Sequence, residues 1–422
     1  MASIPDRDRL LRNEKDFIDL KLTVESDSNL LHTAECLRAN STIKNVTVTI
    51  FPGAQWEDDG DDDGEDGIAV FFRALGGLPS LKELRMVASR HSHKQFLPMK
   101  CLAEALRGAK NLELLSLHGL QVAPTPNDIN SNNADESLLL ATSLEHLSSL
   151  KEFSLIKTKM EAKTNNNNNN NNHIGSNHQL IYDNIFMALS KHPILEEIVI
   201  RGPVDATTNF TPKALASLFQ CPTLRELDIT QIQVKDSHFI EISKVLLAAE
   251  RQLLLETFVI SGTFGQRGSE ALAEILKNNT VSSLKTFQMN WVSTSAPLDS
   301  KGIRAIAAAL ERNDSLETFS VTGRRAIVTD LSPMVEMMRV NTALKLLEIE
   351  TLNENSNNQQ LSQKRRELHC YLKLNRAGRQ RLLRQEESVP RSAWVATMTR
   401  VADHLDCLFV LLMTNPMLCQ SG

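Results

Sequence analysis

The 422-residue sequence predicts an α/β solenoid, in which stacked units of one strand and one helix form an inner parallel sheet and an outer layer of helices. Three observations lead to this prediction. Leucine accounts for 60 residues although the hydrophobic total is an ordinary 41 %. A short apolar spacing recurs along most of the chain, and helical apolar patterns fill the intervals between its copies. One aliphatic residue type at equivalent positions favours internal repeats over two or three unrelated domains.

The recurring element is an apolar residue followed by further apolar residues three and five positions later. The later two positions lie two residues apart, which is the period of a strand with one buried face. A weaker copy at Phe17, Leu20 and Leu22 predicts an additional first unit, and the segment 368–374 predicts a last strand. The ten clear copies begin at Ile43, Leu81, Leu112, Leu150, Leu195, Leu224, Leu255, Leu284, Leu316 and Leu344.

Helical spacing appears between the copies, for example at Leu215, Leu218 and Phe219, or at Ile303, Ile306 and Leu310. The last five intervals between copies are each about 30 residues long. A strand and a helix in each interval require parallel strands, because every strand is reached through a crossover helix.

Three early intervals are longer, and each contains an insert that we expect to be disordered, near residues 54–67, 121–136 and 161–179. The first holds eight acids and no base within residues 57–66, and the third contains eight consecutive asparagines, Asn165 to Asn172. Such segments have too little apolar content to fold and are expected as solvated loops. The acidic run also lacks the glycine and glutamate positions of a calcium-binding loop.

The ends of a solenoid need caps, which divides the chain into three parts. Residues 1–42 are expected to form an N-terminal cap with a degenerate first repeat, 43–375 the repeats, and 376–422 a helical C-terminal cap. The basic residues Arg376, Arg379, Arg381 and Arg384 are interpreted as a solvated face of this cap, with contacts to phosphates or an acidic partner as the alternative. A helical apolar set is expected to pack on the last repeat, or alternatively to bind a partner: Trp394, Val395, Met398, Val401, Leu405, Leu408 and Leu412.

The repeats resemble leucine-rich repeats, specifically the long type of the ribonuclease-inhibitor-like superfamily. The resemblance rests on the segments SLKELRM, NLELLSL, TLRELDI, SLKTFQM and SLETFSV, each followed by a helix such as LAEAL, ALAEIL or IAAAL. It covers about residues 17–375 and implies a horseshoe with the parallel sheet on its concave side.

The sequence departs from this family at one position. The family usually has Asn or Cys eight residues after the first leucine, where the side chain bonds neighbouring backbone. Here the turns must be satisfied differently, with Gly119, Gly202, Gly262 and Gly323 as candidates. The residues at that site are Ser89, Leu120, Thr158, Pro203, Ile232, Thr263, Val292, Arg324 and Leu352.

No arrangement of residues predicts catalysis, a cofactor or a metal site. The sequence contains no glycine-rich phosphate loop, no nucleophile motif and no cluster of cysteines and histidines at ligand spacing. The six cysteines are expected to be reduced thiols, and those at 36, 101 and 407 to behave as small apolar residues. We therefore expect a protein that is not an enzyme.

The candidate binding surface is the concave face of the sheet, where the third, fifth and seventh positions of each copy point. Its third position is largely acidic in the N-terminal half of the chain, and Arg85 and Arg201 are expected to counter part of this charge. Trp291 is expected to be exposed beside it. The alternative is a polar face with no other task than solvation. The candidate partner contacts are Glu83, Arg85, Ser116, His118, Glu152, Glu197, Arg201, Glu226, Asp228, Gln288, Asn290 and Trp291.

Two classes of function remain open at this point. The first is a non-enzymatic scaffold that binds a protein or peptide carrying basic residues. The second is a regulator of an enzyme in trans, because some proteins of the resembled superfamily activate small GTPases and others select substrates for ubiquitin ligases. The net charge of −5 argues against a nucleic-acid partner. We expect a monomer without a membrane partner, in the cytoplasm or alternatively in the nucleus.

Overall fold

The computed structural model describes most of the chain, in two compact units that are treated separately below. Unit 1 comprises residues 1–233 and unit 2 residues 234–422. The described residues are 18–24, 30–51, 67–88, 96–124, 133–160, 174–202, 210–249, 251–263, 265–278, 281–291, 300–323, 328, 330–350, 359–383 and 391–414.

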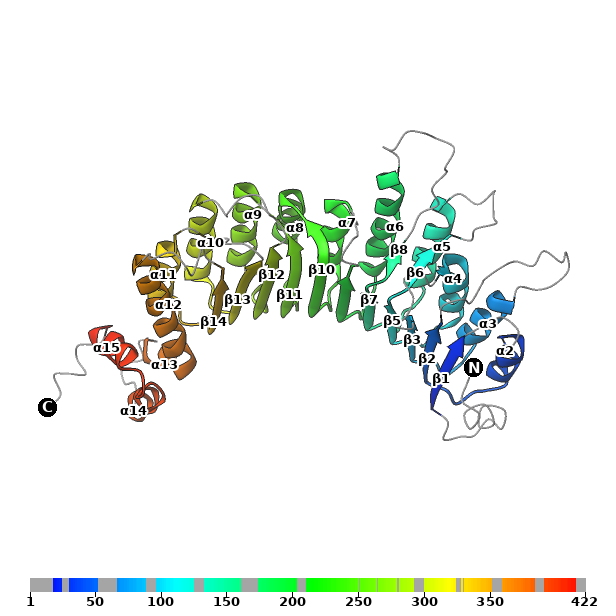
Figure 1. Cartoon of the computed structure of the whole chain (residues 1–422), viewed down its shortest axis with the longest axis horizontal. Helices are drawn as coiled ribbons and strands as arrows, with labels where there is room; N and C mark the ends of the chain where they lie inside the picture. Colours follow the sequence, from blue (N-terminus) through cyan, green and yellow to red (C-terminus); the bar gives the residue numbers. More distant parts are fainter. Residues whose placement is uncertain are drawn as a thin grey trace. The chain divides into compact units, whose positions relative to one another are not determined.

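Unit 1 alternates strands of the main parallel sheet with helices (Figure 1). Its main strands are β1 (Asp19–Val24), β2 (Asn45–Ile50), β3 (Glu83–Ala88), β5 (Leu114–His118), β7 (Glu152–Ile156), β9 (Glu197–Arg201) and β10 (Glu226–Val234). Its helices are α2 (Leu30–Arg38), α3 (Gly67–Gly76), α4 (Met99–Gly108), α5 (Asn133–Glu145), α6 (Ile174–Leu189), α7 (Pro212–Ser217) and the 3₁₀ helix η2 (Leu218–Gln220). A second, three-stranded parallel sheet contains β4 (Phe96–Pro98), β6 (Gln121–Ala123) and β8 (Lys159–Met160).

Unit 2 continues the alternation and ends in helices. Its strands are β11 (Thr257–Gly262), β12 (Thr286–Trp291), β13 (Thr318–Gly323) and β14 (Leu346–Ile349). Its helices are α8 (Asp236–Ala248), α9 (Gln266–Lys277), α10 (Ser300–Arg312), α11 (Ser332–Val340), α12 (Gln359–Ala377), α13 (Arg379–Leu383), α14 (Arg391–Arg400) and α15 (Leu405–Thr414). Within unit 1 the strands of the main sheet follow the order β1-β2-β3-β5-β7-β9-β10, and within unit 2 the order β11-β12-β13-β14.

The strand register confirms the repeat that the sequence predicted. Leu84 of β3 pairs with Val46 of β2 and with Leu115 of β5, so the fourth positions of successive copies lie side by side. The weaker first copy is also a strand, because Leu20 of β1 pairs with Val46 in parallel. The additional first unit that the sequence predicted is therefore confirmed as a strand of the sheet.

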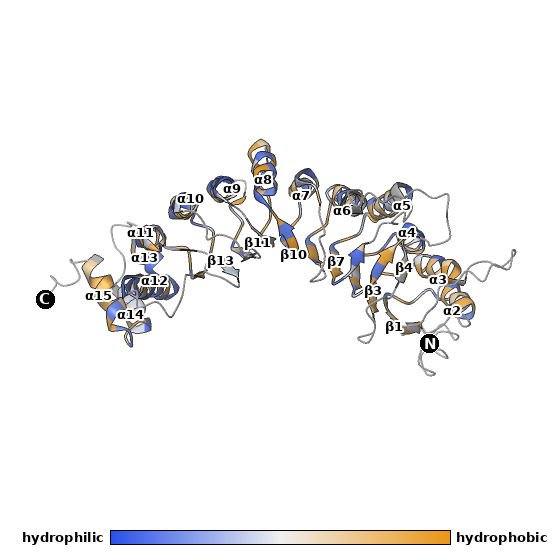
Figure 2. Cartoon of the chain, turned by 45° about the horizontal axis from the view of Figure 1, so that its top comes forward, coloured by the Kyte–Doolittle hydropathy of each residue, from blue (hydrophilic) through white to orange (hydrophobic). Residues whose placement is uncertain are grey.

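Every strand has one face that the helices cover, and in several strands the other face is more exposed. In β12 the burial alternates strictly, with Phe287 and Met289 buried and Gln288 and Asn290 exposed. Within each unit the helices cover the buried face (Figure 1), and the strands carry hydrophobic and hydrophilic segments side by side (Figure 2). We call the uncovered side the open face of the sheet.

Several of the turns that lead from a helix into the next strand contain a polar side chain at a fixed position, three residues before the first apolar residue of the copy. Asn341 is 4 % exposed, donates from its amide to the carbonyls of Leu310 and Asn313 at 2.6 and 2.8 Å, and accepts from the backbone of Leu344 at 2.8 Å. Asn313 holds its turn in the same way, since its amide donates to the carbonyl of Leu276 at 2.7 Å and its oxygen accepts from the backbone of Leu316 at 2.8 Å. Asn40 accepts from the backbone of Ile43 at 3.0 Å, but its amide nitrogen has no partner among the described residues. These turns lie at the amino ends of the strands.

Two other polar residue types, cysteine and histidine, occupy this turn position in unit 1. The thiol of Cys221 donates to the carbonyls of His192 and Leu195 at 3.4 and 3.5 Å. His192 is 2 % exposed, and burial lowers the pKa of its imidazole. The carbonyls of Leu144 and Leu147 oppose this shift, although neither makes a hydrogen bond of standard geometry with the ring.

The glycines named from the sequence lie at the opposite, carboxyl ends of the strands. Gly119 has φ of +71°, the left-handed region that glycine adopts without strain. Gly262 instead allows close contact, because a Cβ there would lie 2.2 Å from the carbonyl oxygen of Val234. The small side chain is needed at both turns, for two different reasons.

Several predictions for the ends and inserts were wrong. The segment 368–374 is part of α12 and not a strand, because its buried residues Leu368, Tyr371, Leu372 and Leu374 recur at helical spacing. The helical apolar set predicted from Trp394 to Leu412 is divided between α14 and α15. Two of its members are exposed, Val395 at 57 % and Leu405 at 78 %. Parts of the predicted inserts are ordered, in β6, α5 and α6. The acidic run and the asparagine tract lie outside the described residues.

The basic segment after α12 differs from the predicted solvated face. Arg379 is 3 % exposed and donates to the carbonyls of Met338 and Asn341 at 2.7 and 2.9 Å. Its guanidinium lies 4.9 Å from the centre of the Tyr371 ring, and burial lowers its pKa to about 10. Arg376 donates to the carbonyl of Lys345 at 2.7 Å. These arginines attach the C-terminal helices to the last repeat, whereas Arg384 lies outside the described residues.

Candidate functional site

The open face of unit 1 carries three columns of side chains, because equivalent positions pair across neighbouring strands. The first column follows the third position of each copy from Asn45 through Glu83 and Leu114 to Glu152. It continues through Glu197 to Glu226. Each step is one strand spacing, about 4.8 Å.

Three glutamates occupy consecutive places in this column, and we call them the glutamate row: Glu152, Glu197 and Glu226 on β7, β9 and β10. None of their carboxylates makes a hydrogen bond or an ion pair with another described residue of the chain. Like charges directly opposite each other in a sheet are destabilising. The row therefore lowers the stability of unit 1 as long as no cation lies over it.

The central carboxyl responds to this arrangement. Burial, and then the negative charges of Glu226 and Glu152, raise the pKa of Glu197 above its ordinary value. Arg201 acts in the opposite direction but does not outweigh them. A raised carboxyl pKa marks a place where added positive charge would be stabilising.

The neighbouring second position shows how the same sheet neutralises charge elsewhere. Glu113 accepts from Lys82 at 2.6 Å and from Lys151 at 2.8 Å, one residue on each side. These two ammonium groups lower the pKa of Glu113 to about 2. In unit 2, Lys285 pairs with Glu256 and Lys345 with Glu317, both at 2.7 Å. The glutamate row lacks this alternation of sign.

Asp228 lies beside the glutamate row in the second column. It is 3 % exposed, and its Oδ2 accepts from the Nε and the Nη2 of Arg201 at 2.8 and 2.7 Å. Its Oδ1 has no hydrogen-bond partner among the described residues. A buried carboxylate oxygen without a donor is costly, so this atom lowers the stability of unit 1.

The remaining predicted residues of unit 1 lie on the same open face but are less distinctive. Arg85 bonds Glu83 at 3.2 Å, so these two neutralise each other as the sequence analysis expected. Arg201, in contrast, pairs with Asp228 and not with the first column. The side chain of His118 is largely exposed. The burial of its remaining part, and then the positive charge of Lys157, lower the pKa of its imidazole. Ser116 is half-buried between Arg85 and Ser154 in the second column.

The predicted residues of unit 2 divide between the two faces of β12. Gln288 and Asn290 are exposed on the open face. Trp291 is 7 % exposed, so the prediction of an exposed tryptophan was wrong. The reason is the strand alternation: Trp291 lies two residues after Met289 and four after Phe287, and therefore shares their buried face.

The described residues offer nothing that would hold a metal ion. They contain no group of three or more His, Cys, Asp or Glu side chains in ligand geometry. The five described cysteines are free thiols and buried, which includes the three that the sequence assigned to apolar positions. Among the described helices, none has both the length and the apolar character that a bilayer crossing requires.

Comparisons with known proteins add no relative. No protein-family model matches the chain. A search of curated proteins also finds no match. The site is therefore interpreted from its own geometry.

Proposed function

We propose that the chain is a non-enzymatic interaction protein built of leucine-rich repeats of the ribonuclease-inhibitor-like type, and that the open face of unit 1 binds a basic segment of a protein partner. The observation that carries this proposal is the glutamate row, three like charges in register on β7, β9 and β10. The partner supplies the cations that the chain itself places opposite Glu113 but not opposite Glu197.

The energetic argument is a contrast between two columns of one sheet. At the second position, alternating lysines and glutamates form ion pairs within the chain. At the third position, the row keeps like charges, which at one strand spacing in water repel each other by up to about 1 kcal/mol for each neighbouring pair. Features that lower stability are expected at functional sites. Binding a basic segment would remove this repulsion and so gain affinity from it.

Asp228 lies beside the glutamate row but is closed to a partner. Its Oδ1 is buried and has no donor among the described residues, while Arg201 occupies Oδ2. The basic residues of the partner therefore interact with the carboxyls of the glutamate row and not with Asp228.

The spacing of the row determines the probe. Two strand spacings separate Glu152 from Glu226, about 10 Å. Arginines two turns apart on a helix are separated by nearly the same distance, with a third arginine between them. A helical peptide with arginines at i, i+4 and i+7 is thus a suitable probe, with a peptide of glutamines at these positions as its control.

The experiment is calorimetric titration of the full chain with this peptide. The test variant replaces Glu152, Glu197 and Glu226 by glutamine. Exposed ion pairs contribute about 0.5 kcal/mol each, so the affinity should fall about tenfold. The matched control replaces three exposed helix glutamates, Glu35, Glu270 and Glu311, and should bind as the wild type does. Equal affinity of both variants would refute the proposal.

A further inference from the structure

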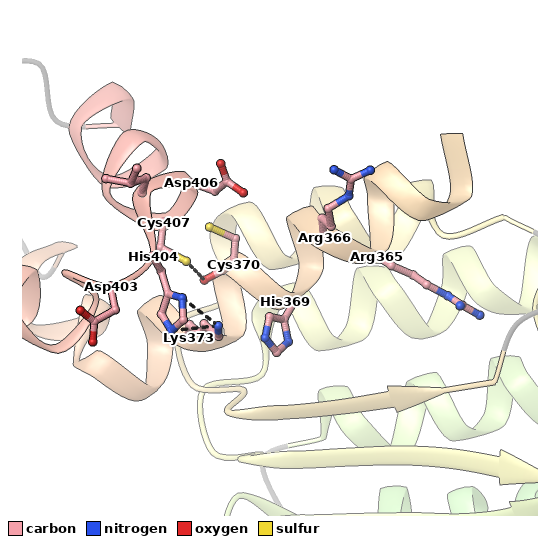
Figure 3. A pocket seen from close by; sticks show the side chains of 10 residues that line it. Arg365, Arg366, His369, Cys370, Lys373, Asp403, His404, Asp406 and Cys407 are labelled. Atoms are coloured by element: carbon pink, nitrogen blue, oxygen red, sulfur yellow. Dashed lines mark hydrogen bonds between the residues drawn. The ribbon is translucent and has the colours of Figure 1, made fainter. Parts of the chain in front are cut away.

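The C-terminal helices of unit 2 line an open cavity that the proposed function does not use. Its volume is about 590 Å³, and it lies between α12 and the segment that joins α14 to α15. Figure 3 shows Arg365, Arg366 and Lys373 extending from α12, with Asp403 and Asp406 on the other side. All of these residues belong to unit 2, so the cavity is defined within one compact unit.

The wall formed by α12 is basic. Arg366 is exposed and forms no ion pair with any other residue in the described part of the chain. Lys373 bonds only the imidazole of His404 among the described residues, at 3.0 Å. Burial, and then the charges of Lys373 and Arg376, lower the pKa of His369 between them. The wall thus has a positive potential that an anionic group would relieve.

The floor and rim of the cavity are apolar. Cys370 and Cys407 are buried at its base, where the thiol of Cys407 donates to the carbonyl of Cys370 at 3.9 Å (Figure 3). Leu405 lines the rim and is 78 % exposed. Phe409 and Met413 follow at helical spacing on α15, each 65 % exposed.

This stripe of Leu405, Phe409 and Met413 is unusual in the chain. Figure 2 shows α15 as a hydrophobic helix beside the more hydrophilic α12 and α14. Large apolar side chains that are singly exposed need no explanation, but three on one helix face next to a cavity mark an interaction surface. A basic wall beside an apolar stripe has the pattern complementary to an acidic amphipathic helix.

We propose that the groove between α12 and α15 binds an acidic amphipathic helix of a partner protein. Its acidic side chains face Arg365, Arg366 and Lys373, and its apolar side chains cover Leu405, Phe409 and Met413. The carboxylates of Asp403 and Asp406 favour this partner over an anionic membrane. A lipid surface would bring negative charge to both aspartates at once, whereas a helix can turn a neutral or basic side chain toward them.

The test uses fluorescence anisotropy with the full chain. The probe is a labelled peptide of about four helical turns, with leucines on one face and glutamates on the other. A scrambled peptide of the same composition lacks the apolar face. Arg366→Glu and Phe409→Ser should each weaken binding about tenfold. The controls are Arg304→Glu on α10 and Leu247→Ser on α8, which change an exposed arginine and an exposed large apolar residue away from the groove. They should leave the affinity unchanged.

Three results would overturn the proposal. The first is no binding of the probe at about 1 mM peptide. The second is equal affinity for the scrambled peptide, or for the groove variants and their controls. The third is binding of the chain to phosphatidylserine vesicles but not to the peptide, with the vesicle binding abolished by Arg366→Glu and by Phe409→Ser. That result would assign the surface to a membrane. The glutamine variant of the glutamate row should bind the acidic peptide normally, which separates this site from the open face of unit 1.

Discussion

Neutralising the centre of the glutamate row should make the protein more stable. In Glu197→Gln, the carboxyl that faces Glu152 on one strand and Glu226 on the other is replaced by an amide of the same shape. Each like-charged pair across neighbouring strands costs up to about 1 kcal/mol in water, and two such pairs are removed. We expect the free energy of unfolding to rise by about 1 kcal/mol at pH 7.

The dependence on pH identifies the cause of this gain. Because the folded pKa of Glu197 is raised above 4.5, the folded protein retains a proton at pH values where the unfolded chain has lost it. The wild type therefore gains stability through this group as the pH falls from 7 through the folded pKa toward 4.5. The advantage of Glu197→Gln should be largest at pH 7 and vanish near pH 4.5.

Urea unfolding of the full chain, followed by circular dichroism at pH 7 and pH 4.5, measures both effects. Glu311→Gln, an exposed glutamate on α10, is the control and should change neither curve. A loss of stability in Glu197→Gln at pH 7 would show that the carboxyls do not repel each other. A gain of the same size at both pH values would assign it to a cause other than charge.

Four further substitutions test the packing. Asn341→Ala should lower the free energy of unfolding in urea by about 2 kcal/mol, because buried backbone groups lose their partners. The wild type should lose stability as the pH falls below 6.5, because the imidazole of His192 takes up a proton in the unfolded chain but resists it when buried. His192→Asn should remove this loss, and stability–pH curves that run parallel for the two proteins would contradict the prediction. Arg379→Ala should cost about 3 kcal/mol and speed proteolytic release of the C-terminal helices, as seen in a digestion time course. Trp291→Phe should lower thermal stability but leave calorimetric binding of the arginine peptide unchanged, because the side chain is buried.

The repeat could be predicted because its signal is local and occurs many times. An apolar residue followed by others three and five positions later defines the strand. In the sheet, Leu84 pairs in register with its equivalents Val46 and Leu115, as the spacing requires. The weaker first copy followed the same rule, since Leu20 and Leu22 pair with Val46 and Val48. The prediction failed where apolar residues lacked the spacing of a strand: the leucines of 368–374 recur at helical spacing, and α12 contains them.

The candidate site was predictable in composition but not in its pairing. Alternation along a strand placed the glutamate row on the open face, and the same rule should have placed Trp291 on the buried one. Which cation would neutralise which acid depends on long side chains that reach across strands. Arg201 therefore bonds Asp228 in the next column, a choice that spacing alone does not determine. The role of Asn341 was missed because it precedes the strand, outside the window in which the repeat motif was aligned.

The most direct test of the proposed function is the pKa of Glu197 itself, measured by carbon-13 NMR of the side-chain carboxyl in the free chain and with saturating arginine peptide. Binding of a cation over the glutamate row would stabilise the ionised form, so the account predicts a raised pKa in the free protein and a fall when the peptide is added. A pKa that does not move on binding would contradict the claim that the open face of unit 1 recognises basic partners.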